Sequence, residues 1–223
     1  MIESARRIYG RHGLESVEKF RHERLGMIRA MVFDVDGVLI EPMIFASILE
    51  SKYDLTRDAT APFFQGPFKR CSLGKADLKQ ELPQYLAKWG WPHSLEEFIR
   101  IWFEADSRIN QDMLSFVKEI RGRGVPCYVA STQEEHRASY LELEMGLADQ
   151  FDECFFSCRV RCEKPDRKFY DLVSSEIGVA SNELLFLDDF EHNVVGARKA
   201  GWNAELHTFG SDPAEVALQY GVL

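Results

Sequence analysis

Two acidic residues that follow an apolar run have the types and spacing for metal or proton-transfer chemistry. The stretch 31–40 reads MVFDVDGVLI, which predicts a buried strand that ends at Asp34 and Asp36, followed by a turn at Gly37. Side chains alternate along a strand, so these two carboxylates project on the same side and repel each other. A divalent cation relieves that repulsion, as does a proton shared between a base and an acid. The alternative is a pair of solvated turn carboxylates.

Three further polar features fall at the expected ends of other strands. Ser131 and Thr132 end one strand and begin a helix, a junction that offers hydroxyls and free backbone amides to an anion. Lys164 lies in a loop before a helix, and Asp188 and Asp189 end another strand. Each feature alone is explained as a helix N-cap or a solvated loop. Together they predict that reactive side chains meet at one sheet edge, where open α/β folds bind ligands.

The elements that must position these residues alternate regularly from residue 111 onward. The expected strands after the first are 125–130, 151–156, 184–187 and 203–207, and the expected helices are 111–122, 134–145, 168–177, 191–200 and one capped by Asp212-Pro213. Strands that alternate with helices predict an α/β fold with a doubly wound parallel sheet.

The segment 42–107 interrupts this alternation and is expected to be all helical. Its expected helices are 42–52, 73–89 and one begun by the capping box Ser94-Leu95-Glu96-Glu97. A polar, turn-rich stretch is expected through 62–67, and Pro83 must kink or interrupt its helix because it removes a backbone donor. The chain is therefore expected to carry a small all-helical domain beside the sheet.

The combined pattern resembles the haloacid dehalogenase (HAD) superfamily of phosphatases. The residues that carry the resemblance are Asp34-x-Asp36-Gly37-Val38, Ser131, Lys164-Pro165, Asp188-Asp189 and Asn193. The resemblance covers nearly all of residues 28–210. The order and spacing of these motifs are specific, whereas a lone Asp-x-Asp would not be specific. The resemblance implies a subfamily I type, with a Rossmann-like core at 27–41 and 108–223 and a helical cap at 42–107 inserted after the first motif.

The resemblance also implies roles for the residues that would act on a phosphate group. Asp34 would be the nucleophile that forms an aspartyl-phosphate, and Asp36 would act as general acid and then as general base. Ser131 would hold the phosphoryl oxygens together with backbone amides, and Lys164 would neutralise the nucleophile and the phosphate. Thr132 stands where the family commonly has Asn, which changes the hydrogen bonding near the phosphate.

Magnesium is the cofactor that the resemblance implies. Asp189, supported by Asp188, would bind Mg²⁺ alongside Asp34 and the backbone carbonyl of Asp36. Asn193 is expected to position a helix rather than to catalyse.

These roles imply a Mg²⁺-dependent phosphatase that hydrolyses a small phosphomonoester, such as a sugar phosphate or a phosphoglycolate-like acid, through an aspartyl-phosphate. A carboxylate that attacks a phosphate meets like charge, so positioning and electrostatics must carry the catalysis. A phosphomutase of the same fold is an alternative, and it must exclude water. A non-catalytic phospho-acceptor or binding module is another, although it would need neither Asp36 as an acid nor so large a helical insertion.

Substrate specificity is expected to come from the helical segment. The candidates are Phe63, Phe64, Lys69, Arg70 and Lys75. For each of them the alternative is ordinary, because aromatic residues pack helices together and Lys and Arg are usually solvated.

Composition limits the partners. The chain has 223 residues, a net charge of −9 and a pI near 5.2, which argues against nucleic-acid binding because phosphate neutralisation needs surplus Lys and Arg. No apolar run reaches about 18 residues and no signal-peptide core is seen, so the expected location is the cytoplasm with no membrane partner. The expected partner is a small phosphorylated metabolite, and the sequence specifies no oligomeric state.

The N-terminus and the cysteines give two further hypotheses. Residues 1–26 are polar and basic, with a short helix expected over 15–25, and Met27 precedes the first strand, so these residues are predicted to be a dispensable extension or a misassigned start. Cys154, Cys158 and Cys162 lack zinc-site spacing and are expected to be small buried or half-buried thiols. Because Cys162 lies near Lys164 in sequence, a lowered pKa and sensitivity to oxidation are the alternative for that thiol.

Overall fold

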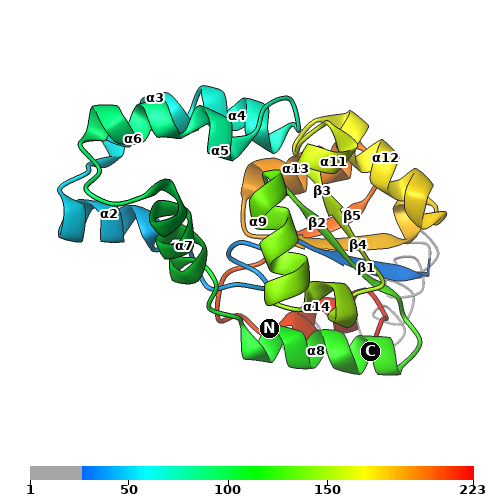
Figure 1. Cartoon of the computed structure of the whole chain (residues 1–223). Coiled ribbons are helices and arrows are strands. Elements are labelled where there is room, and N and C mark those ends of the chain that lie inside the picture. The colour runs from blue at the N-terminus through cyan, green and yellow to red at the C-terminus, as the bar shows by residue number, and fades with distance from the viewer. Residues whose placement is uncertain (1–26) are drawn as a thin grey trace, which may run out of the picture.

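One five-stranded parallel sheet forms the centre of the molecule (Figure 1). The computed structural model describes residues 27–223, and its strands are β1 (Ala30–Phe33), β2 (Cys127–Ser131), β3 (Glu153–Phe156), β4 (Leu184–Asp188) and β5 (Asn203–Leu206). They lie in the order β3-β2-β1-β4-β5, so the chain builds the sheet outward from β1 in one direction and then in the other. The predicted α/β fold with a parallel sheet is confirmed. The hypotheses about residues 1–26 lie outside the described residues.

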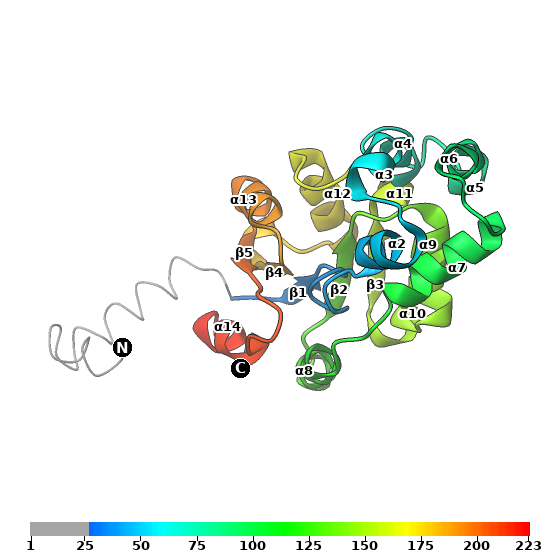
Figure 2. The same ribbon diagram turned by 90° about the vertical axis from the view of Figure 1, so that its left-hand side faces the viewer.

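Helices cover both faces of the sheet. They are α8 (Gln111–Gly122), α12 (Arg167–Ile177), α13 (Glu191–Lys199) and α14 (Pro213–Gln219). On one face, Met31 and Phe33 of β1 share an apolar cluster with residues of α8 and α14. On the other face, Ala30 and Val32 share a second cluster with α12 and α13, and Figure 2 shows the sheet between the two layers. A strand buried on both faces must be apolar throughout, which explains the sequence AMVF in β1.

Shorter helical elements fill the connections. They are α9 (Glu135–Ser139), the π-helical turn η1 (Tyr140–Glu144), α10 (Leu147–Gln150), α11 (Ser157–Val160) and the 3₁₀ turn η2 (Ser181–Glu183). The helix expected over 134–145 is α9 continued by η1. It begins where the Glu134 carboxylate accepts hydrogen bonds from the backbone N–H groups of His136 and Arg137, which an unpaired helix start requires.

Residues 45–105 form a separate helical unit with its own apolar core (Figure 1). Its helices are α2 (Phe45–Tyr53), α3 (Arg57–Phe64), α4 (Pro67–Ser72), α5 (Leu78–Glu81), α6 (Pro83–Trp89) and α7 (Leu95–Ala105). Phe45, Phe63, Phe98 and Trp102 are buried at its centre. The Ser94 hydroxyl accepts a hydrogen bond from the backbone N–H of Glu97, as the capping box predicts.

Two predictions about the interior of this helical unit are wrong. The stretch 62–67 is not turn-rich, because α3 continues to Phe64 and Pro67 takes the first position of α4, where a missing N–H costs nothing. The helix expected over 73–89 is broken, because 73–77 form a turn and Asp77 then caps α5 by accepting from the N–H of Gln80. Pro83 begins α6, so its predicted interruption of the helix is confirmed.

The start of α2 also differs from the prediction, and the reason lies far along the chain. The helix begins at Phe45 rather than at Pro42. Oδ1 of Asp106 accepts hydrogen bonds from the backbone N–H groups of Ile44 and Phe45, at 2.7 and 2.9 Å. A carboxylate more than sixty positions away therefore caps the helix, and local sequence carries no sign of it.

Candidate active site

The ends of three adjacent strands bring the predicted side chains together. Phe33 of β1 is in register with Leu187 of β4, and the backbone N–H of Asp34 donates to the Leu187 carbonyl at 2.9 Å. Asp34 and Asp188 consequently leave their strands at the same level. Ser131 ends β2, on the other side of β1. This is the switch point of the sheet, where open α/β folds bind ligands.

Lys164 lies between two of these carboxylates. Its Nζ is 2.8 Å from Oδ1 of Asp34 and 2.6 Å from Oδ2 of Asp188. All three side chains are buried, so these charge-assisted contacts are screened little by water. Burial alone would lower the pKa of Lys164, but the two carboxylates outweigh it and raise that pKa, so the ammonium keeps its charge.

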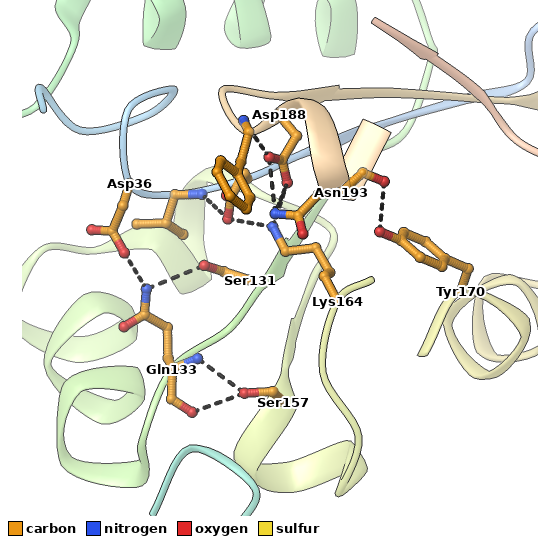
Figure 3. A network of polar contacts seen from close by, with 11 residues as sticks. Asp36, Ser131, Gln133, Ser157, Lys164, Tyr170, Asp188 and Asn193 are labelled. Atoms are coloured by element: carbon orange, nitrogen blue, oxygen red, sulfur yellow. Dashed lines mark hydrogen bonds and ion pairs between the residues drawn. The ribbon is translucent and has the colours of Figure 1, made fainter. Parts of the chain in front are cut away.

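The Asp188 carboxylate is held by donors from the start of α13 (Figure 3). It accepts hydrogen bonds from the Phe190 N–H at 2.8 Å and from Nδ2 of Asn193 at 3.0 and 3.1 Å. The backbone carbonyl of Asn193 in turn accepts from the Tyr170 hydroxyl at 2.8 Å. Asp188 is completely buried, and these donors replace the water that it loses. Asn193 thus ties α13 to the carboxylate, as expected of a positioning residue.

Three of the carboxylates form a group with the composition of a site for a divalent cation. Asp34, Asp188 and Asp189 each offer an oxygen atom, and these atoms all lie within 4.8 Å of one another. It is the one such cluster of acidic, His or Cys side chains found within residues 27–223. Hard divalent cations such as Mg²⁺ prefer carboxylate oxygens, so the donor set fits that ion.

The acidities of these carboxyl groups show how unfavourable their charges are without a cation. Burial raises the pKa of Asp34 from 3.8 to about 8, opposed by Lys164 and reinforced by Asp188. Burial, and then the charge of Asp188, also raises the pKa of Asp189. A group of carboxyls that resists ionisation is what a cation site presents before the cation binds.

Gly37 is the residue that leaves room for Asp189. Its φ of +77° lies in the left-handed region, which glycine adopts without strain. A Cβ atom at this position would lie 2.0 Å from Oδ2 of Asp189. Any side chain there would therefore displace the Asp189 carboxylate.

Asp36 is held by a residue that the sequence analysis missed. Oδ2 of Asp36 accepts a hydrogen bond of 2.6 Å from Nε2 of Gln133, which also donates to the Ser131 hydroxyl at 3.1 Å (Figure 3). Oδ1 of Asp36 lies 4.0 Å from the buried guanidinium of Arg137. Gln133 follows Ser131 by two positions, so extended backbone would point both side chains the same way, and this spacing is the signal that could have revealed it.

The predicted residues surround one cavity of about 400 Å³. Its walls include Asp34, Asp36, Ser131, Thr132, Lys164 and Asp189. Asp188 does not line it and instead lies behind Lys164, fully buried. The structure therefore brings the predicted catalytic, phosphate-binding and metal-binding residues together, with Asp188 as their support.

The specificity candidates do not line this cavity. Phe63 is completely buried in the core of the helical unit, whereas Phe64 lines a second, neighbouring cavity. Lys69 forms an ion pair with Glu163 at 3.2 Å, and Arg70 forms one with Glu81 at 2.7 Å. Lys75, the fifth candidate, is exposed.

Contacts at α9 and at α4 join the helical unit to the sheet domain, and before α5 Oδ2 of Asp77 lies 3.1 Å from Nε2 of His136. Arg137 of α9 donates from Nη1 to the Phe103 carbonyl at 2.9 Å and from Nη2 to the Asp106 carbonyl, both near the end of α7. At α4, the Ser157 hydroxyl lies 2.6 Å from the Ser72 carbonyl, and Lys69 meets Glu163. The helical unit is thus attached on two sides of the candidate site.

The cysteines take no part in the site. Cys158 and Cys162 are buried in different apolar clusters, on opposite faces of the sheet, so the three thiols spaced by four do not gather. Burial raises the pKa of Cys162 rather than lowering it. The predicted lowering of the Cys162 pKa is therefore wrong, because the thiolate loses more from burial than it gains from the charge of Lys168.

The fold and the site define an α/β protein with acids grouped at the carboxyl ends of the central strands of its parallel sheet. Residues 28–201 match the family model of the haloacid dehalogenase-like hydrolases, and the chain belongs to this family. It is 26% identical to a sesquiterpene phosphatase from Aspergillus oryzae, over 78% of this chain and 86% of that protein. It is 29% identical to bifunctional epoxide hydrolase 2 from Rattus norvegicus, over 78% of this chain but about a third (35%) of that protein's length.

Solved structures support the same fold. A HAD family enzyme from Bacteroides thetaiotaomicron, in complex with magnesium and inorganic phosphate, superposes with a TM-score of 0.73 at 19% identity, covering 85% of this chain and 98% of that one. L-2-haloacid dehalogenase from Xanthobacter autotrophicus gives 0.62 at 23% identity, covering 85% and 81%. Within residues 27–223, no helix is both long enough and apolar enough to cross a membrane.

Proposed function

We propose that this HAD-family hydrolase is a Mg²⁺-dependent phosphatase that acts on a phosphomonoester through an aspartyl-phosphate on Asp34. The observation that carries the proposal is the arrangement of Lys164 between Asp34 and Asp188, with Asp189 completing an oxygen-donor group and Asp36 lining the same cavity. The nucleophile Asp34, the ammonium of Lys164 and a second carboxyl for proton transfer, Asp36, are thereby available in one cavity.

In the first half-reaction, an oxygen of Asp34 attacks phosphorus, and the bond from phosphorus to the alcohol oxygen breaks. Asp36 donates its proton to that oxygen as the alcohol leaves. Lys164 and the Ser131 hydroxyl offset charge on the phosphoryl oxygens, because they line the same cavity as Asp34.

In the second half-reaction, water attacks phosphorus while the bond to Asp34 breaks. Asp36 takes the proton from that water, which restores both side chains. Splitting the displacement into two steps lets one carboxyl serve as acid and then as base. Gln133 keeps the Asp36 carboxyl in a fixed orientation through its 2.6 Å hydrogen bond.

Magnesium would be held by Asp34 and Asp189, with Asp188 beside them, as the donor set allows. When bound, it supplies positive charge that lets the carboxylates and a phosphate dianion approach one another.

We assign the helical unit the role of a cap, inserted between β1 and α8 in the manner of subfamily I. Its two attachments, at Arg137 and at Ser157, hold it over the side of the cavity where Asp36 lies. The remainder of the chain, over 27–41 and 108–223, is the catalytic core of this proposal. A small phosphorylated metabolite is the expected partner.

Phosphate release from a panel of phosphomonoesters tests the function. Wild type is compared with Asp34→Asn, in Mg²⁺ and in EDTA, and Asp112→Asn serves as the matched control because Asp112 is exposed on α8. We expect Mg²⁺-dependent release that Asp34→Asn lowers by about three orders of magnitude or more, since it removes the nucleophile.

A folded wild type that releases no phosphate from any ester would contradict the proposal, as would an unaffected Asp34→Asn variant. Turnover only in the presence of a bisphosphate would indicate the phosphomutase instead.

A further inference from the structure

A second cavity adjoins the candidate site on the side of the helical unit. It has a volume of about 550 Å³ and shares three lining residues with the first cavity, namely Asp36, Met43 and Thr132. Volumes of this size are typical of sites for small molecules. Because Asp36 is the proposed acid for the leaving oxygen, the shared wall lies where the alcohol part of a substrate must emerge.

The walls of the second cavity are predominantly apolar. Its large or aliphatic lining residues include Phe45, Leu49, Ala61, Phe64, Phe68 and Trp102. The aromatic rings are already packed on one another, with the Trp102 centroid 5.5 Å from Phe45, 5.5 Å from Phe64 and 5.4 Å from Phe68. The cavity is therefore preformed by a rigid aromatic group and does not need to be assembled by a ligand.

The polar side chains on the inner wall already have partners. Nε2 of Gln133 donates to Asp36 and Ser131. The Thr60 hydroxyl is within 3.2 Å of the Thr56 and Arg57 carbonyls of its own helix. A polyhydroxylated ligand would find few groups here to replace its bonds to water.

The two charged groups on that wall are engaged as well. Arg137 donates to the Phe103 and Asp106 carbonyls, and the Asp106 carboxylate caps α2 at Ile44 and Phe45. Of the other polar lining residues, Asp36 and Thr132 lie on the wall shared with the first cavity, and Arg57 and Gln65 are exposed to solvent. The polar groups next to Asp36, namely Gln133 and Arg137, are thus engaged with protein partners, and the part of the wall formed by α2, α3, α4 and α7 is mostly apolar.

From these observations we infer that the substrate is the phosphate monoester of an apolar alcohol, whose hydrocarbon chain or ring occupies the second cavity. This inference rests on the proposed phosphatase function and names its substrate class. It disfavours sugar phosphates and phosphoglycolate-like acids, because their hydroxyl or carboxylate groups would be desolvated against apolar walls without compensating hydrogen bonds.

The first test is the dependence of kcat/KM on chain length for n-alkyl phosphates from methyl to decyl, each below its micelle concentration. Each buried methylene is worth about 0.8 kcal/mol, so we expect kcat/KM to rise by up to about fourfold per methylene until the cavity is filled. Glucose 6-phosphate and phosphoglycolate are measured beside them and should be poorer than octyl phosphate. A flat or falling series, or a preference for the polar esters, overturns the inference.

Two substitutions on the same helix give a matched comparison. Ala61 lines the second cavity, whereas Ala59 lies two positions earlier on α3 and is exposed. Ala61→Trp should fill the cavity and abolish the increase with chain length, while Ala59→Trp should keep the wild-type slope. Equal slopes in the two variants would contradict the assignment of the cavity.

A binding measurement keeps the inference testable if Ala61→Trp does not fold. Decyl phosphate and inorganic phosphate are titrated calorimetrically into Asp34→Asn at several temperatures. Burial of the chain predicts tighter binding of decyl phosphate with a more negative heat-capacity change, and equal affinities would overturn it.

Failure of this inference is distinguishable from failure of the proposed function. If no ester yields phosphate, the phosphatase proposal fails. If esters are hydrolysed with no dependence on chain length, the phosphatase proposal stands and the apolar substrate class is wrong.

Discussion

The carboxyl edge of the sheet, where Asp34, Lys164 and Asp188 lie, and the second cavity lie side by side and share Asp36. The edge is built from buried charges, whereas the cavity is built mainly from apolar groups. At the edge, buried charges meet in pairs, as Lys164 meets Asp34 and Asp188. In the cavity, aromatic and aliphatic groups face an open volume, and nearby polar groups hold the structure together instead of facing a ligand. Under the proposals above, chemistry and selectivity reside in separate parts of the chain. Substitutions at the edge should lower turnover of every ester equally, and those in the cavity should reorder the esters.

Lys164→Met should break the edge most severely. Without the ammonium, two buried carboxyls lose their cation, and we expect kcat/KM to fall by about a thousandfold for all alkyl phosphates alike. Lys168→Met, on an exposed residue of the following helix, is the control. A change in chain-length preference in Lys164→Met would show that the two regions are not separate.

The same variant should show a stability defect that grows with pH. Lys164 opposes the raised pKa of Asp34, so its loss raises that pKa further above the unfolded value near 3.8. A carboxyl with a higher pKa in the folded state takes up a proton on folding, so stability falls as pH rises from about 4 through the folded pKa. Urea unfolding in EDTA should therefore show a difference from wild type that is nearly constant below about pH 7 and grows above about pH 8, where Asp34 ionises in folded wild type but not yet in the variant.

Gly37→Ala should have the next largest effect. The added Cβ meets the Asp189 carboxylate, so we expect a tenfold to hundredfold loss of Mg²⁺ affinity and of kcat/KM, roughly as for other disturbed metal supports. Gly90→Ala is the matched control, because Gly90 has a similar φ of +67° but nothing within 4 Å of an added Cβ. It should cost about 1 kcal/mol of stability, measured by urea unfolding, and leave Mg²⁺ affinity unchanged. Equal loss of affinity in both would assign the effect to backbone strain.

Gln133→Ala should have the smallest effect of the three. It removes one donor from Asp36 and one from Ser131, and a hydrogen bond to a charged group is worth about 1.5–3 kcal/mol. We expect kcat to fall by about tenfold or somewhat more, with the chain-length slope unchanged. Gln111→Leu, on the surface of α8, should match wild type. A steeper or flatter slope in Gln133→Ala would place Gln133 in the cavity rather than at the edge.

Much of the edge was predictable from sequence because its carboxylates and Ser131 end or directly follow recognisable strands, whereas Lys164 lies in a loop. Asp34, Ser131 and Asp188 come directly after apolar runs whose parallel pairing requires their ends to meet. The cap of α2 by Asp106 was not predictable, since it depends on how two distant segments pack. The same holds for Gln133, whose partner Asp36 is 97 positions away in sequence.

The second cavity could not be predicted from the sequence, for a different reason. Phe63 and Phe64 are adjacent and equally apolar, yet one fills the core of the helical unit and the other lines the cavity. When apolar residues lie on several sides of a short helix, their spacing does not show which side faces the core. Periodicity therefore does not distinguish an aromatic ring packed in the core from one that lines a ligand cavity. Lys69 and Arg70, the charged specificity candidates, form ion pairs with Glu163 and Glu81.

The unequal attachments of the helical unit determine where it can pivot. Separating Arg137 from the Phe103 and Asp106 carbonyls would leave the buried guanidinium without these two acceptors, at a cost of several kcal/mol. Separating α4 breaks the Lys69–Glu163 ion pair, worth about 0–1 kcal/mol because the Lys69 side chain is 62% exposed, and the Ser157–Ser72 hydrogen bond, worth about 0.5–1.5 kcal/mol. Opening would therefore rotate the unit about the end of α7 as a hinge and lift α4, so faster hydrogen exchange in α4 than at that end of α7 is its signature. An apolar ester would enter along the α4 side, and the proton donor Asp36 would stay beside the hinge throughout.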